Sequence, residues 1–174
     1  MKKQIGGAGF VDQLRMGFIA GFLATLLFHQ LTVAFLRGVH VVSVLPFSMT
    51  PTEPFGIPFV LSLAFWGGIW GIVLLFVQRK FPGGPAYWAT SFLFGAIFPS
   101  FAALAIVLPL KGHPMGGGWP LPLVAAALMS NGAWGVGTAL FLRTLGRRRR
   151  ALRIVDASSP HGGSAGARNL KVLR

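Results

Sequence analysis

Few side chains in this sequence could take part in chemistry, and His29 is the most conspicuous of them. It lies inside a long apolar stretch, and Thr25, His29 and Thr32 are spaced so that a helix would place them on one face. An ionisable residue inside an apolar span is costly and is a functional candidate by default. Three roles stay open: a neutral His29 that hydrogen-bonds a neighbouring helix such as the one carrying Asn131, a haem or metal ligand, and a proton relay or substrate contact.

The other candidate ligands do not define a catalytic or metal site. His40, Glu53 and His113 follow the first and third apolar stretches, at spacings that match no short ligand motif. The chain has no cysteine, which excludes disulfides, thiol catalysis and thiolate ligands. It also lacks the GxSxG, HExxH and P-loop motifs and any paired carboxylates near a span. We therefore expect no enzyme, no cofactor and no metal.

Four apolar stretches must position these residues. The chain is 53% hydrophobic and only 11% charged, whereas a soluble domain is usually about a quarter charged. Each stretch is long enough for a helix to cross a hydrocarbon core of about 30 Å, where unpaired backbone groups exclude other structures. The sequence predicts an all-α fold, an integral membrane four-helix bundle. Its parts are a segment 1–15, spans at 16–36, 58–78, 88–110 and 121–142 within a domain 16–142, and a basic tail 143–174.

Positive charge predicts the orientation of these spans. Only Arg37 and Lys111, of the 16 Lys and Arg residues, fall on the side opposite the two termini. The positive-inside rule then places both termini in the cytoplasm of a bacterial inner membrane. A basic cluster after the fourth span is expected to contact anionic lipid headgroups, and it lacks the interleaved aromatics of a nucleic-acid site. This cluster consists of Arg143, Arg147, Arg148, Arg149, Arg150 and Arg153.

Small residues are expected to pack the helices together, because lipid supplies no hydrophobic drive for association. The glycines at helical spacing are Gly17 and Gly21, Gly67 and Gly71, and, in the fourth span, Gly135. Asn131 shares a helical face with Gly135 and Thr138. An unsatisfied amide is costly in hydrocarbon, so Asn131 should hydrogen-bond a neighbouring helix, with a substrate contact as the alternative.

Two proline-containing segments suggest local irregularities. Pro99 lies in the middle of the third span, where it removes a helical hydrogen bond and predicts a kink. Ser100 or a facing polar group is expected to meet the carbonyl of Gly95 that Pro99 frees. In the first outer loop, residues 50–53 have capping-box form and predict at most one helical turn, in a loop that caps the helices or docks a partner.

An internal repeat relates the two halves of the apolar region. Gly68–Ile72 aligns with Gly132–Val136, and the first and third spans share a Phe-x-x-Gly at Phe18 and Phe92. The pattern indicates two helical hairpins in the same orientation, related by an axis along the membrane normal.

Three short motifs resemble those of small four-span bacterial inner-membrane proteins. They are Phe-His-Gln at 28–30, Trp-Gly-Gly-x-Trp-Gly at 66–71 and Asn-Gly-Ala-Trp-Gly at 131–135, and the resemblance covers roughly residues 14–145. It implies a membrane location and brings no activity. We therefore expect an accessory or structural subunit, packed in a larger membrane complex or as a homo-oligomer. The alternatives are a small oligomeric transporter or channel with His29 and Asn131 lining the path, and a haem- or metal-binding redox protein.

Overall fold

The computed structural model describes residues 7–158, with side chains for residues 9–148. The chain is 79% helical and has almost no strand in this part, which confirms the predicted all-α class. It divides into two units, Met1–Leu142 and Arg143–Arg174. The side chains of Arg149, Arg150 and Arg153, which belong to the predicted basic cluster, lie outside the described residues, as does all of segment 159–174.

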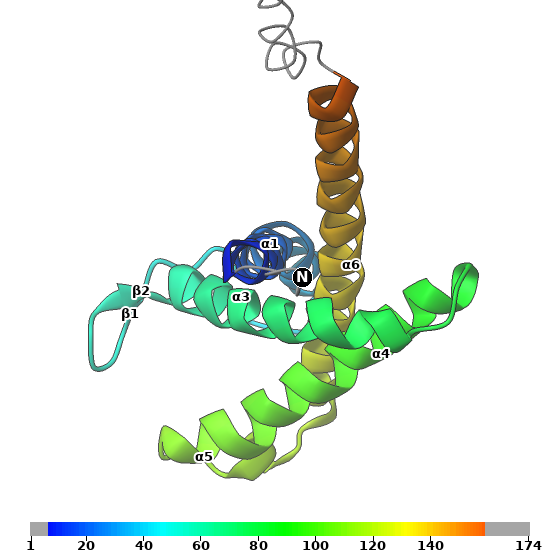
Figure 1. The fold of residues 1–174 in the computed structure, drawn as a ribbon. Coiled ribbons are helices and arrows are strands. Elements are labelled where there is room, and N and C mark those ends of the chain that lie inside the picture. The colour runs from blue at the N-terminus through cyan, green and yellow to red at the C-terminus, as the bar shows by residue number, and fades with distance from the viewer. Residues whose placement is uncertain (1–6, 159–174) are drawn as a thin grey trace, which may run out of the picture. The chain divides into compact units, whose positions relative to one another are not determined.

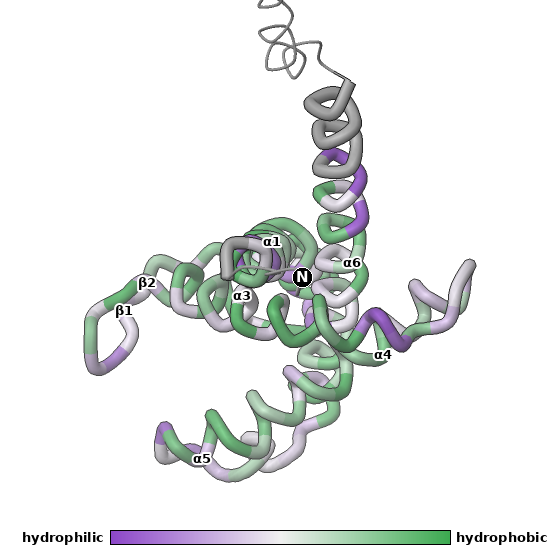
Figure 2. The backbone as a smooth tube through the Cα atoms, in the orientation of Figure 1, coloured by the Kyte–Doolittle hydropathy of each residue, from purple (hydrophilic) through white to green (hydrophobic). Residues whose placement is uncertain are grey.

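Four of the described helices are long and apolar enough to cross a membrane (Figures 1 and 2). Two of them are interrupted by π-helical segments, named η1 and η3. The first comprises α1 (Gly7–Ala24), η1 (Thr25–His29) and α2 (Gln30–Gly38), and the second comprises α3 (Phe59–Val77) and the 3₁₀ turn η2 (Gln78–Lys80). The third comprises α4 (Pro85–Phe101), η3 (Ala102–Val107) and α5 (Leu108–Leu110), and the fourth is α6 (Leu121–Ser158). A 3₁₀ segment, η4 (Met115–Gly118), precedes α6.

The turn between the second and third helices follows from its sequence. Gly84 has a φ of +64°, a left-handed value that glycine adopts without steric cost. Pro85 is the first residue of α4, where its missing N–H group would have had no helical partner. This pair fixes the point at which the chain turns back into a helix.

Helices α1 and α3 touch through their backbones. A Cβ atom added to Gly21 would lie 2.2 Å from the carbonyl oxygen of Gly67 and 2.8 Å from the Cα of Gly71. One added to Gly71 would lie 2.4 Å from the carbonyl oxygen of Gly17. No side chain larger than glycine fits at these positions without separating the helices, so the four glycines allow the close approach.

Helices α4 and α6 repeat this arrangement. A Cβ atom on Gly95 would lie 2.2 Å from the carbonyl oxygen of Asn131, and one on Gly135 would lie 2.2 Å from that of Ser91. An aromatic ring also covers a glycine in each pair. The Phe18 ring lies 2.6 Å from a Cβ built on Gly68, and the Phe92 ring lies 2.4 Å from one built on Gly132. The two helix pairs therefore use equivalent contacts at equivalent sequence positions.

The loop between α2 and α3 contains a short hairpin where the capping-box pattern predicted at most one helical turn. Strand β1 (Pro51–Thr52) pairs antiparallel with β2 (Ile57–Pro58), just before α3 (Figure 1). Thr52 Oγ1 donates to the carbonyl oxygen of Ile57 at 2.7 Å. Residues 53–56 form one turn, closed by a bond from the N–H of Gly56 to the carbonyl oxygen of Thr52, and no helix follows because Pro54 disfavours the helical backbone at Glu53 and offers no N–H group.

Candidate functional site

The π-helical segment η1 contains two of the three predicted polar residues of the first span. Such segments carry an extra residue per turn and are frequent at functional sites. Thr25 is 2% exposed, and its Oγ1 donates to the carbonyl oxygen of Gly21 at 3.0 Å. The same oxygen lies only 1.9 Å from the position of a Cβ built on Gly67. Thr25 therefore packs η1 against α3.

His29 ends this segment with one ring nitrogen unsatisfied. Its Nδ1 is buried and has no hydrogen-bond partner among the described residues. The structure does not give it the expected bond to a neighbouring helix. Two hydroxyl groups on α6, Ser130 Oγ and Thr138 Oγ1, are likewise buried without a partner in the described part of the chain. Ser130 and Thr138 are 2% and 0% exposed.

Trp134 lies between these two hydroxyl-bearing residues on the same face of α6, at i, i+4, i+8 spacing. Its Nε1 donates to the carbonyl oxygen of Gly21 at 2.9 Å, and the side chain is 2% exposed. The Gly21 carbonyl thus accepts from both Thr25 and Trp134. Reasoning from the sequence did not assign this role to Trp134. The available signal was an indole N–H in the middle of an apolar span, where it needs a partner.

Asn131 joins α6 to α4. Its Nδ2 donates to Ser100 Oγ at 3.0 Å, and Ser100 Oγ donates to the carbonyl oxygen of Ala127 at 3.0 Å. Ser100 therefore bonds across to α6 instead of meeting the carbonyl of Gly95. Helix α4 continues through Pro99 to Phe101, and η3 follows directly. Asn131 therefore bonds to the third long helix, whereas His29 lies on the first.

Gln30, the residue after η1, binds the loop between α2 and α3. It is 3% exposed, and its Oε1 accepts a 2.7 Å hydrogen bond from the backbone N–H of Phe47. Phe47 has a φ of +52°, so its backbone is in the left-handed region. Reasoning from the sequence noted Gln30 only as a neighbour of His29. A buried amide in an apolar stretch was the signal that it has a specific partner.

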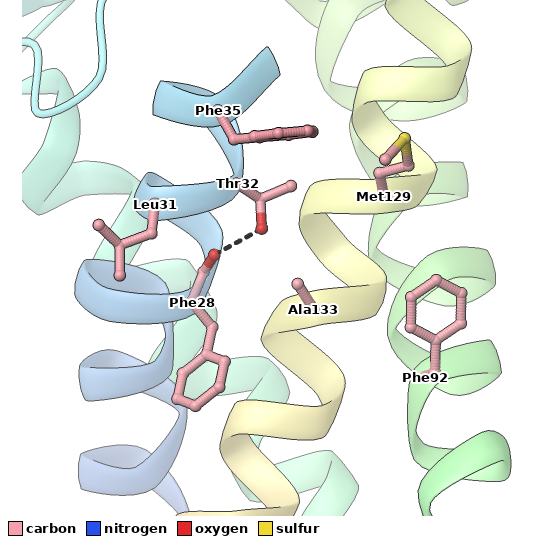
Figure 3. A pocket seen from close by; sticks show the side chains of 7 residues that line it. All are labelled: Phe28, Leu31, Thr32, Phe35, Phe92, Met129 and Ala133. Atoms are coloured by element: carbon pink, nitrogen blue, oxygen red, sulfur yellow. Dashed lines mark hydrogen bonds between the residues drawn. The ribbon is translucent and has the colours of Figure 1, made fainter. Parts of the chain in front are cut away.

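An open cavity of about 450 Å³ lies between the second half of the first helix, α4 and α6 (Figure 3). Its polar side chain is Thr32, whose Oγ1 donates to the carbonyl oxygen of Phe28 at 2.8 Å. That hydroxyl proton is therefore already used within the helix. The remaining lining side chains are apolar: Phe28, Leu31, Phe35, Phe92, Met129 and Ala133. The cavity suits hydrocarbon better than a polar ligand.

The residues considered as metal ligands do not converge. No group of three or more His, Asp and Glu residues within the described chain could hold a metal ion. His40 Nδ1 instead lies 3.0 Å from the carbonyl oxygen of Gly38, two residues away.

A polar contact joins the first and second helices at the opposite end. Arg79 donates from Nη2 to Gln13 Oε1 at 2.6 Å and stacks its guanidinium 5.4 Å from the centre of the Phe76 ring. This contact places Gln13 of α1 and Arg79 of η2 at the same level along the two neighbouring helices.

No protein-family model, curated protein or solved structure matches the chain. Its function is therefore inferred from the geometry described above.

Proposed function

We propose that this chain is a non-catalytic integral membrane protein of a bacterial inner membrane. Its four helices would span the bilayer, and it would act as an accessory or structural subunit in a larger membrane complex or with copies of itself. The length and apolar character of the four helices support this proposal. So do large apolar side chains on their surfaces, such as Phe35, Trp66 and Phe101, which are 61%, 59% and 64% exposed. Contact of these side chains with lipid would cost little free energy, whereas their exposure to water would be unfavourable.

The observation that carries the structural role is how the interior polar groups are used. Asn131 bonds Ser100, Ser100 bonds the backbone of α6, and Trp134 bonds the carbonyl of Gly21 on α1. These groups hold helices together, which is the main use of polar side chains between membrane helices. Groups committed to such bonds are not available to guide a polar substrate.

The repeated contacts support two hairpins in the same orientation. Phe18 on Gly68 corresponds to Phe92 on Gly132, and Gly21 with Gly71 corresponds to Gly95 with Gly135. Equivalent contacts at equivalent positions are expected when an axis along the membrane normal relates the two hairpins. Arg15, Arg79 and the basic segment after residue 142 would then face the cytoplasm and its anionic headgroups.

A small transporter or channel is the second candidate, and the unsatisfied polar atoms favour it. His29 Nδ1, Ser130 Oγ and Thr138 Oγ1 are buried without partners among the described residues. An unpaired buried polar atom costs about 1–3 kcal/mol, a cost that a bound water or substrate would remove. Four helices enclose little space, so such a pathway would require several copies of the chain.

The mass and composition of the particle extracted from native membranes in mild detergent would test the proposal. A particle that contains other polypeptides in fixed ratio supports an accessory subunit. A particle that contains several copies of this chain alone supports a homo-oligomer and calls for transport assays. A particle with a single copy of the chain and no other protein contradicts both forms of the proposal.

A further inference from the structure

The first outer loop folds back along the helices instead of rising away from them. Helix α2 ends at Gly38, yet the backbone N–H of Phe47 donates to Gln30, eight residues before that end. The backbone N–H of Val60, at the start of α3, donates to the carbonyl oxygen of Ser48 at 3.0 Å. Both contacts place residues 47 and 48 beside the helices.

The depth of these contacts follows from the helical rise. The hydrogen bond between Gln13 and Arg79 marks one level at the cytoplasmic end of the first two helices. Gln30 lies 17 residues beyond Gln13, which corresponds to about 25 Å at the rise of an α-helix. A hydrocarbon core is about 30 Å thick, so Phe47 meets Gln30 below its outer edge. Helix α2 continues about 12 Å past this level.

The side chains of the loop are those of a lipid-facing surface. Among residues 39–58, Glu53 is the one side chain of the Asp, Glu, Lys and Arg types. Within residues 44–57, the exposed large apolar side chains are Val44 (50%), Leu45 (60%), Phe47 (46%), Met49 (65%), Phe55 (82%) and Ile57 (45%). Phe59 and Leu61, at the start of α3, are also exposed, at 37% and 43%.

The backbone of the loop is also suited to a position at the edge of hydrocarbon, where unpaired polar groups are costly. Strands β1 and β2 pair with each other. The N–H of Gly56 donates to the carbonyl oxygen of Thr52 at 2.8 Å, and the N–H of Phe59 donates to that of Thr50 at 2.9 Å. With Gln30 bonded to Phe47, the loop supplies partners for several of its own backbone groups.

We propose that residues 44–57 are inserted into the outer leaflet, with phospholipid acyl chains against Met49 and Phe55. This inference rests on the proposed membrane-spanning topology. Lipid is favoured over a protein partner because Phe47 meets Gln30 at hydrocarbon depth, the exposed side chains of the loop are large and apolar, and Glu53 is its one carboxylate or cationic group. The loop would then enlarge the area that the chain occupies in one leaflet only.

Depth-dependent fluorescence quenching tests the proposal, since the chain has no native cysteine. Phe55→Cys would carry an environment-sensitive fluorophore in full-length protein reconstituted into phospholipid vesicles. Two sets of lipids, brominated near the headgroup and deep in the acyl chains, would quench from the membrane at the two depths, and iodide would quench from water. His113→Cys, in the other outer loop, is the control for an aqueous position, and Ile97→Cys, 54% exposed on α4, is the control for a lipid-facing position.

Brominated lipid should quench Phe55→Cys at least about twofold more than His113→Cys, and iodide should show the opposite order. Met49→Cys should behave like Phe55→Cys, which shows that the result does not depend on one label. Iodide quenching of both loop labels, with Ile97→Cys still quenched by lipid, would overturn the loop insertion alone. That result would instead favour a protein partner as the occupant of this surface. An Ile97→Cys label that lipid does not quench would overturn the membrane-spanning proposal and the loop insertion with it.

Discussion

The indole N–H of Trp134 donates to the backbone carbonyl of Gly21, and this bond joins the first of the four long helices to the last. Its counterpart lies in the other half of the repeat, where the Trp70 ring meets the Phe94 ring edge-on with centroids 6.3 Å apart. Each hairpin thus contributes the tryptophan of its second helix to the first helix of the other hairpin. These two side chains hold the pairs together, while glycines hold each pair internally.

Replacing Trp134 with Phe should lower the free energy of unfolding by about 1–3 kcal/mol, because the smaller phenyl ring loses the hydrogen bond to Gly21 and leaves part of the buried indole site empty. Unfolding in mixed micelles with increasing SDS, followed by circular dichroism, would measure the change. Trp66→Phe is the matched control, since Trp66 is 59% exposed. Equal effects of the two substitutions would show that the Gly21 bond contributes nothing.

Gly21→Ala should destabilise the protein by about 1–3 kcal/mol, because the added methyl group would meet the backbone of Gly67 and force the helices apart. Gly95→Ala should have an effect of the same size, since Gly95 is its equivalent in the second pair. Gly38→Ala is the control, because nothing lies within 4 Å of its added Cβ. Thermal denaturation in detergent would rank the three, and a neutral Gly21→Ala would contradict the close approach of α1 and α3.

The Asn131–Ser100 bond should appear as a coupling energy in a double-mutant cycle. Asn131→Ala, Ser100→Ala and the double variant should give an interaction term of about 0.5–1.7 kcal/mol, the range measured for such bonds between membrane helices. Asn131→Ala combined with Ser62→Ala, on α3, should be additive. A zero coupling for Asn131 with Ser100 would mean that the bond does not stabilise the fold.

His29→Leu distinguishes a structural role from the transport and cofactor alternatives. If the chain is a structural subunit, the variant should retain its assembly and its stability, because Leu fills the site without the unsatisfied Nδ1. Size-exclusion chromatography and thermal denaturation would report both properties, with His40→Leu in the outer loop as control. Retained assembly with lost transport, or with a lost absorbing cofactor, would instead support the corresponding alternative. Lost assembly would make His29 itself a structural residue.

Single cysteines placed in the cysteine-free chain should report the orientation of the helices. A membrane-impermeant maleimide should label His113→Cys in spheroplasts, and should label Arg148→Cys only after the membrane is permeabilised. The reason is that the positive-inside rule places the Arg-rich end of α6 in the cytoplasm. The reverse pattern of labelling would contradict the proposed orientation.

The long helices could be predicted from the sequence because their signal is local. Four apolar runs predicted four spans, and the first observed helix is longer than its predicted span, 7–38 against 16–36. The additional helical turns lie outside the apolar runs, where hydropathy does not indicate whether the backbone is helical. The glycine pairs on the first and second spans were also visible, and the structure brings Gly21 against Gly67 and Gly71.

The rest depends on contacts between distant residues, which a single sequence does not reveal. The π segment at Thr25–His29 begins four residues after Gly21. The carbonyl of Gly21 accepts a hydrogen bond from Trp134, which is 113 residues away in the sequence. The bond from Phe47 to Gln30 likewise requires the loop to fold back. The capping-box pattern at 50–53 is followed by one turn and no helix for a local reason, since Pro54 disfavours helix at the preceding residue.

The glycine contacts also have a consequence for the order in which the protein assembles as it is synthesised. Both closely packed pairs, α1 with α3 and α4 with α6, come from consecutive helices of the chain. Chains fold from the N-terminus as they leave the ribosome, at about 5–20 residues per second. The first pair can therefore close before α4 exists, and the second closes as α6 emerges. The bond from Trp134 to Gly21 also requires α6, so the two halves can be joined through it only at the end of synthesis.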